Sequence, residues 1–168
     1  MKTIALILTS FLFLTGCTGV PKRDKVNSEP HKSVEWYKNG QKKSESSIKD
    51  GKPIGLITAW YENGQKQWES NFKDGLFHGV MTSWYENGQK WEESTWRSGK
   101  KHGLSVFWYE NGQKKSEENI KDGKPDGLST FWDENGQSTA RLILKNGKTV
   151  KRLWMSPSFM EKLLQNSQ

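Results

Sequence analysis

The chain alternates short runs of apolar and β-branched residues with polar turns from about residue 33 to residue 150. Gly55–Tyr61 is one such run, and its composition predicts a β-strand. Asn63–Gly64 follows it and is a strong hairpin signal, because both residue types tolerate a positive φ. Gln65–Lys73 is then the returning strand, and Lys73–Gly75 starts a second turn that we expect Gly79 to close. The pattern therefore predicts a unit of two antiparallel strands and two tight turns.

This unit recurs with a period of 24 residues. Five tryptophans and five turn glycines keep the same step: Trp36, Trp60, Trp84, Trp108 and Trp132, with Gly40, Gly64, Gly88, Gly112 and Gly136. Self-similarity this strict indicates a repeat array in which each unit rests on its neighbours. We predict an all-β fold, in which five 24-residue β-hairpins form an extended, twisted antiparallel meander sheet of about ten strands, with a short C-terminal helix.

The register of the hairpin decides which side chains share a face. A two-residue loop at Asn63–Gly64 places Trp60 and Trp68 on opposite faces of the sheet. A three-residue loop, with Gly64 in the left-handed conformation, instead places Trp60 opposite Lys66 and Thr58 opposite Trp68. We prefer the second register because it gathers the apolar side chains on one face.

The preferred register predicts two unlike faces. On one of them the Trp column lies beside a second apolar column, Ile48, Phe72, Trp96, Ile120 and Leu144. The opposite face carries a tyrosine column and a glutamate column: Tyr61, Tyr85 and Tyr109, with Glu45, Glu69, Glu93 and Glu117.

The first residues follow a different pattern. A positive start at Lys2 and an apolar run over Ile4–Leu14 are typical of a secretory signal, and the run is shorter than the about 20 apolar residues of a membrane span. The sequence Leu-Thr-Gly-Cys that ends at Cys17 resembles a bacterial lipobox. This resemblance implies a signal peptide at residues 1–16 and an acylated Cys17 that anchors an exported protein to a membrane. An uncleaved signal anchor is the alternative.

Further boundaries follow from composition. Residues 17–32 are polar, contain Pro21 and Pro30, and are predicted to form a flexible tether after the acylated cysteine. The repeat domain is predicted at 33–150 and a C-terminal cap at 151–168, where Ser158–Glu161 resembles a helix capping box. Thr18, rather than an acidic residue, follows the cysteine, which resembles outer-membrane sorting where the source is a double-membraned bacterium.

Composition and charge narrow the classes of protein. Only 32% of the residues are hydrophobic, yet 9 are Trp, which favours a thin, tryptophan-rich layer over a thick core. The net charge is +7, and the basic residues are spread along the repeats, which favours solvated strand surfaces over a nucleic-acid site. A single cysteine excludes an internal disulfide.

Candidate chemistry is sparse. His78 and His102 each precede a repeat glycine, but equivalent positions in successive hairpins lie two strands apart, at about 9.6 Å. Zinc ligands converge at about 2 Å from one ion, so we predict no metal site. The glutamate column offers no unique cleft for paired carboxylates, and the glycines have the spacing of turns rather than of a phosphate loop. We predict no catalytic residue, no cofactor and no small-molecule substrate, and a role of the Trp columns in the core rather than as a platform for nucleic acid or sugar.

The repeat motif Trp-Tyr-x-Asn-Gly-Gln-Lys, followed by Glu and by Lys-Asp-Gly-Lys, resembles the MORN repeat variant over about Ser33–Lys148. Proteins of this arrangement are grouped with the YwqK family, the antitoxin component of a toxin–antitoxin system. With the lipobox, the resemblance implies a non-enzymatic, surface-tethered lipoprotein that binds a protein or membrane partner. Tyr61, Tyr85 and Tyr109 form its candidate binding face. The alternatives are an antitoxin or immunity component whose partner is a toxin and, less favoured, an envelope hydrolase.

Overall fold

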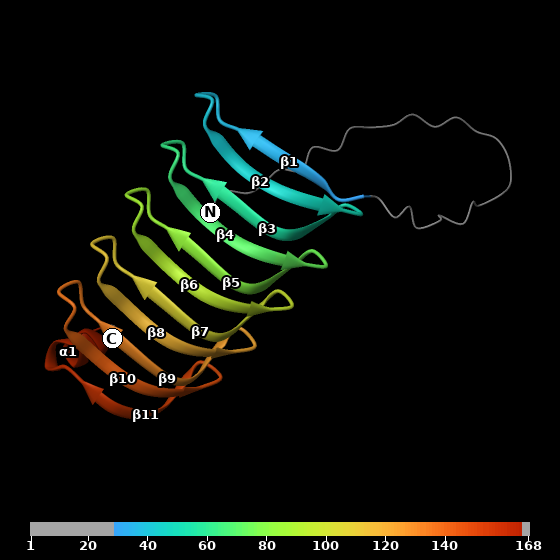
Figure 1. Cartoon of the computed structure of the whole chain (residues 1–168). Helices are drawn as coiled ribbons and strands as arrows, with labels where there is room; N and C mark the ends of the chain where they lie inside the picture. The colour runs from blue at the N-terminus through green and yellow to red at the C-terminus, as the bar shows by residue number, and fades with distance from the viewer. Residues whose placement is uncertain (1–28, 166–168) are drawn as a thin grey trace, which may run out of the picture.

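The computed structural model describes residues 29–165 as one open antiparallel sheet followed by a short helix (Figure 1). Eleven strands lie side by side in chain order, and each pairs with the next, so the predicted all-β meander is confirmed. The predicted signal peptide, Cys17 and the tether up to residue 28 lie outside the described residues. The sheet has one strand more than expected, because the turn at Asn146–Gly147 leads into a further strand.

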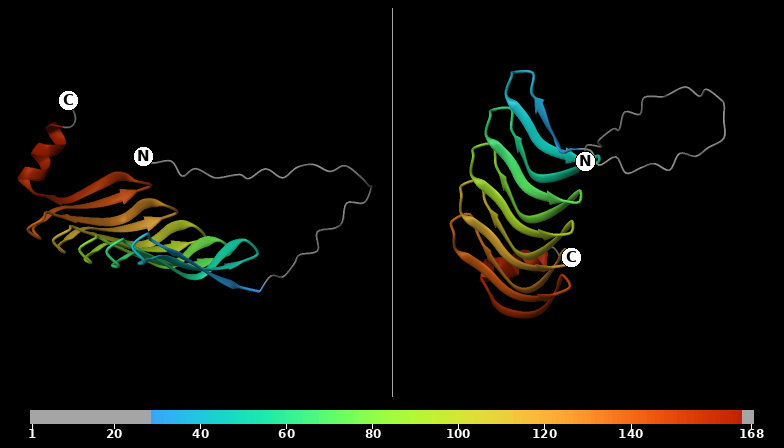
Figure 2. Two further views of the ribbon diagram at one scale, coloured as in Figure 1. Left: turned by 90° about the horizontal axis from the view of Figure 1, so that it is seen from above. Right: turned by 45° about the vertical axis from the view of Figure 1, so that its right-hand side comes forward.

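The strands are β1 His31–Trp36, β2 Lys42–Lys49, β3 Lys52–Trp60, β4 Lys66–Lys73, β5 Leu76–Trp84, β6 Lys90–Arg97, β7 Lys100–Trp108, β8 Lys114–Lys121, β9 Lys124–Trp132, β10 Ser138–Lys145 and β11 Lys148–Met155, and the helix is α1 Pro157–Gln165. The strands are bowed, and the helix projects from the β10–β11 end of the sheet without covering either face (Figure 2). Within residues 29–165, neither face of the sheet is covered by a second layer.

The loop at the centre of each hairpin has the predicted geometry. Gly64 has a φ of 85°, and Trp60 pairs with Lys66. The amide of Gly64 donates to the Tyr61 carbonyl at 2.9 Å, and the amide of Gln65 donates to Asn63 Oδ1 at 2.9 Å. The Asn side chain and the left-handed glycine thus close the turn together.

The second turn differs from the prediction. Asp74 and Gly75 have φ values of 54° and 81° and form a two-residue turn that Lys73 and Leu76 flank as paired residues. Gly79 does not close this turn. It lies inside β5 with a φ of 84°, within a stretch where the register between β4 and β5 shifts.

The predicted assignment of side chains to faces is wrong, because each hairpin contains a β-bulge. Trp60 pairs with Lys66, but Ala59 already pairs with Trp68, so Gln67 is an extra residue on β4. Thr58 therefore lies opposite Glu69 instead of Trp68. One inserted residue moves every later side chain of the strand to the other face.

Two faces result, which we name the ladder face and the reverse face. The ladder face carries the Trp60 and Glu69 columns together, and Leu56, Val80 and Leu104 are 45–55% exposed on it. The reverse face carries the Trp68, Ser70 and Phe72 columns. The second apolar column, Ile48, Phe72, Trp96, Ile120 and Leu144, therefore lies on the face opposite the Trp60 column.

The core is as thin as the composition predicts. Within residues 29–165 the buried hydrophobic residues are Ile57, Ala59, Val106 and Ala140, and the largest fully buried side chains are serines. The helix is capped by Ser156, whose Oγ accepts the Phe159 amide at 3.2 Å, and Pro157 takes the first helical position. The capping residue is thus Ser156 and not Ser158. Proline favours the first position of a helix, so Pro157 starts the helix two residues before the start that the predicted box implies.

Candidate binding surfaces

The repeat motif forms hydrogen bonds between successive hairpins. Each tyrosine hydroxyl donates to the carbonyl of the next Trp at 2.8–3.0 Å: Tyr37 to Trp60, Tyr61 to Trp84, Tyr85 to Trp108 and Tyr109 to Trp132. Each loop asparagine donates from Nδ2 to the next loop carbonyl at 2.7–3.0 Å: Asn39 to Glu62, Asn63 to Glu86, Asn87 to Glu110 and Asn111 to Glu134. The recurrent Tyr and Asn therefore fasten each hairpin to its successor.

The candidate binding tyrosines are half-buried members of this series. Burial raises the pKa of Tyr61, Tyr85 and Tyr109 above the ordinary value, and a nearby glutamate in the next loop adds to the rise. Their hydroxyl protons are already donated within the array, so a partner could contact the ring surfaces or donate to the hydroxyl oxygens. A binding role for these three residues stays a prediction.

The ladder face alternates tryptophan, lysine and glutamate. Each lysine lies over the Trp ring of the next hairpin, 5.1–5.8 Å from its centroid: Lys42 over Trp60, Lys66 over Trp84, Lys90 over Trp108 and Lys114 over Trp132. The same lysines bond Glu45, Glu69, Glu93 and Glu117 at 2.5–2.8 Å. This face therefore offers little unpaired charge to a ligand.

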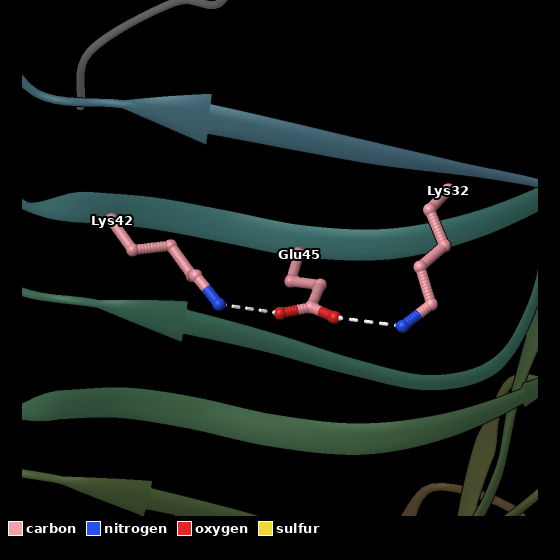
Figure 3. Close-up of polar contacts among 3 residues, drawn as sticks. All are labelled: Lys32, Lys42 and Glu45. Atoms are coloured by element: carbon pink, nitrogen blue, oxygen red, sulfur yellow. Dashed lines mark hydrogen bonds and ion pairs between the residues drawn. The ribbon is translucent and has the colours of Figure 1, made fainter.

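The first hairpin, at the β1 edge of the sheet, shows the same pairing of lysine with glutamate. Glu45 accepts from Lys42 at 2.7 Å and from Lys32 at 3.4 Å, one on either side (Figure 3). These hydrogen bonds, that from Lys42 above all, lower the pKa of Glu45 below its ordinary value. Trp36 begins the Trp series and is 61% exposed, because no earlier strand of the described region pairs with β1.

On the reverse face, one row of cross-strand neighbours mixes small and large side chains. Its members, paired strand by strand, are Ala59, Trp68, Ser83, Glu92, Phe107, Ser116, Phe131 and Ala140. Trp68 fills the space between Ala59 and Ser83. Ser116 stands between two phenylalanines and leaves a hollow of about 330 Å³, which Trp91 and Glu118 also line. Because the row varies from hairpin to hairpin, this hollow is not a feature of every repeat.

A partly buried ion pair interrupts the same row. Glu92 is 4% exposed, and its carboxylate accepts a hydrogen bond from Lys101. The Lys101 ammonium also lies over the Trp96 and Phe107 rings, at 5.6 and 5.2 Å. The equivalent residues of the preceding hairpin are Trp68 and Phe77, so two opposite charges stand here where that hairpin has two aromatic residues.

The histidines do not come together. His102 Nδ1 lies 3.7 Å from Asp122 Oδ1, and His78 is exposed. In residues 29–165 no three His, Cys, Asp or Glu side chains are close enough to share a metal ion. The same part of the chain contains no helix with the length and hydropathy needed to span a membrane.

The C-terminal end of the sheet carries exposed apolar side chains beside basic ones. Val150, Leu153 and Trp154 of β11 are 45–62% exposed, and Met160 and Leu164 of α1 are 49% and 70% exposed. Three exposed basic residues are interleaved with them on β11: Lys148, Lys151 and Arg152. Sequence reasoning missed this end of the molecule, although a count of charges by segment would have found it.

Comparison with known families supports the repeat assignment in the middle of the array. Residues 77–97 and 101–122 each match the MORN repeat variant, and each match spans one hairpin, β5–β6 and β7–β8. These two adjacent repeats are therefore MORN-like, which indicates a protein built as a repeat-based binding or scaffold surface. No curated protein matches the chain.

Proposed function

We propose that this protein is a non-enzymatic lipoprotein, anchored through an acylated Cys17, whose repeat sheet serves as a scaffold held against the membrane by its C-terminal end. The observation that carries the proposal is the joint exposure of Trp154, Leu153 and Val150 beside Lys148, Lys151 and Arg152. Apolar and tryptophan side chains flanked by lysine and arginine suit the boundary between lipid headgroups and acyl chains.

The distribution of charge supports this orientation. Residues 31–140 contain 16 basic and 16 acidic residues, so the repeats are neutral as a whole. Residues 141–165 contain six basic residues and one acidic residue, and they thus carry five of the seven net positive charges. The six are Arg141, Lys145, Lys148, Lys151, Arg152 and Lys162, and the acidic residue is Glu161. Basic residues near an anionic membrane surface contribute about 1 kcal/mol each.

A second contact complements the lipid anchor. Acyl chains on Cys17 would fix one end of the protein but would not by themselves set how the sheet is oriented. Attraction between the C-terminal end and anionic headgroups would then set which way the sheet points. The ladder face and the reverse face would both stay accessible to partners.

Vesicle flotation tests the C-terminal contact without the anchor. The mature part of the chain, residues 18–168, which lacks both the predicted signal peptide and the cysteine, is mixed with phosphatidylglycerol-rich vesicles and with neutral phosphatidylcholine vesicles. We expect binding to the anionic vesicles only, and its loss when Lys148, Lys151 and Arg152 are all changed to Glu. The matched control changes Lys73, Lys100 and Lys124, which are exposed in the repeats, to Glu. Equal loss in both triple variants, or no binding to anionic vesicles, would rule out the proposed membrane contact.

Fatty-acid labelling tests the anchor separately. Cells that express the protein are grown with a labelled fatty acid, and label is expected in the wild-type protein and absent from Cys17→Ala. Label retained by the variant, or absent from both proteins, argues against acylation at this residue. The two experiments fail independently, because one requires no acyl chain and the other requires no C-terminal surface.

The antitoxin or immunity function is the second candidate, and it rests on the resemblance of the repeat motif to the YwqK family. Its partner would be a toxin encoded nearby. Co-expression with a neighbouring open reading frame that arrests growth tests this function, and growth unrescued by the protein rejects it.

A further inference from the structure

We propose that the hollow on the reverse face binds a neutral sugar ring. The hollow lies over β7, β8 and β9, where the reverse-face row of cross-strand neighbours places Ser116 between Phe107 and Phe131. Its volume is about 330 Å³, and it is open to solvent. This inference goes beyond the proposed function and requires neither the lipid anchor nor the C-terminal end.

The hollow exists because one small side chain stands where a large one would fit. In the second hairpin Trp68 occupies the equivalent position and fills the space between Ala59 and Ser83. Two phenylalanines flank Ser116, which is only 5% exposed at the bottom of the gap. A concave gap of this size between aromatic rings, with a few polar groups at its edge, can receive a ligand.

The walls are flat and apolar. Trp91 is 37% exposed, and its ring centroid lies 6.2 Å from that of Phe107, with the two planes inclined by 34°. The apolar C–H face of a pyranose ring packs well against such surfaces, because aromatic side chains bury a large area with little conformational freedom. Trp91 is the residue of the bulge, and this position turns its ring toward the hollow.

The rim supplies one cation and one anion. Lys115 and Glu118 both line the hollow, and a Glu118 carboxylate oxygen accepts the Ser116 hydroxyl at 3.0 Å. The second carboxylate oxygen can accept a ligand hydroxyl, and the Lys115 ammonium can donate to one. Because the two charges cancel, the site suits a neutral ligand with hydroxyl groups better than a phosphate or a carboxylate.

The equivalent positions one hairpin earlier lack this chemistry. Trp91 corresponds to Gln67, Phe107 to Ser83, and Glu118 to Ser94. The hairpins therefore share the bulge and the loops but not the hollow. These differences also provide substitutions that the fold already accommodates elsewhere in the array.

Calorimetric titration with neutral oligosaccharides tests the site. The full chain with Cys17→Ala is titrated with glucose-, mannose- and N-acetylglucosamine-based pentasaccharides up to millimolar concentration. We expect at least one to bind, and we expect Trp91→Gln to weaken that binding by about tenfold or more. Glu118→Ser should weaken it as well, and Trp36→Ala, which removes an exposed Trp at the far end of the sheet, should not.

The outcomes separate a sugar site from the alternatives. Circular dichroism of each variant checks that the sheet is retained, so that lost binding is not lost folding. Failure of every neutral sugar to bind would overturn the proposal, and so would binding that Trp91→Gln leaves unchanged. A charged saccharide or a peptide that binds the hollow in place of all neutral sugars would overturn it too.

Discussion

At the scale of single residues, much of the recurring motif consists of side chains that form hydrogen bonds to the next hairpin. The final repeat shows their purpose, since Asp133 stands there in place of tyrosine and its Oδ1 accepts the amides of Asn135 and Gln137 within its own loop. Tyrosine recurs where a following Trp carbonyl is available, and the chain uses another residue where the series ends. The motif residues therefore recur because they make contacts between repeats.

Asn87→Ala is expected to destabilise the array more than Asn135→Ala. Asn87 donates to the Glu110 carbonyl at 3.0 Å and accepts the Gln89 amide at 2.9 Å, whereas Asp133 accepts the corresponding amide in the last loop. Loss of these exposed bonds should lower the free energy of unfolding by about 1 kcal/mol. Urea denaturation of both variants measures the difference, and equal midpoints would contradict an inter-hairpin role for Asn87.

The tyrosines give the array a dependence on alkaline pH. Burial raises the pKa of Tyr85, so the folded state keeps its proton at a pH where the unfolded state, with a pKa of about 10, has lost it. The resulting stability is fully present below that value and falls as the pH rises through the higher pKa of the folded state. Urea midpoints at about pH 9 and about pH 11 should therefore fall less in Tyr85→Phe than in wild type. An identical fall in both proteins would show that Tyr85 ionises alike in the folded and unfolded states.

At the scale of elements, the sequence predicts the hairpins and loops but not the strand interior. The loop asparagine and glycine specify Trp60 opposite Lys66, and the structure confirms this pair. The bulge at Gln67 escapes prediction because local propensity does not mark it. A signal was nevertheless present: lysine and glutamate recur three residues apart, as in Lys66 and Glu69, and such residues share a face only across a bulge.

The reverse-face hollow was beyond prediction for the same reason. Ser116 is recognised as a gap only when Phe107 and Phe131 are known to be its cross-strand partners. The one-residue error in register placed these residues in unrelated columns. A site formed by pairing between strands thus depends on the register more strongly than a site formed by one loop.

The glycines with a positive φ inside the odd-numbered strands are a second irregularity of the sheet. A substitution at Gly79 tests how much they matter for stability. Its φ is 84°, and nothing lies within 4 Å of a Cβ added there, so Gly79→Ala would meet backbone strain without a steric clash. We expect a loss of about 1–2 kcal/mol in the free energy of unfolding. Asp74→Asn, which introduces the residue type that Asn146 supplies at the equivalent turn, should stay within about 0.5 kcal/mol of wild type. A neutral Gly79→Ala would mean that β5 relaxes to a regular strand.

At the scale of the whole molecule, the array is one sheet in which each hairpin contacts only its neighbours. Its contacts along the chain repeat with the sequence period of 24 residues, as the Tyr-to-Trp bonds show. Stability should then be close to a sum over hairpins and the interfaces between them. The length of the sheet is consequently adjustable, provided that whole periods are added or removed.

Excision of residues 53–76 removes one such period and tests this view of the molecule. Lys52 is then followed by Phe77, the equivalent of Pro53, and Tyr37 meets the Trp84 carbonyl in place of that of Trp60. We expect far-UV circular dichroism of a β-sheet and a loss of roughly 1–4 kcal/mol in unfolding free energy, the usual share of 24 residues. Excision of residues 53–64, half a period, should abolish folding, because it joins Lys52 to Gln65 and replaces a strand with a loop end. If the whole-period variant failed to fold while single substitutions were tolerated, the hairpins would depend on distant parts of the sheet and the nearest-neighbour description would be wrong.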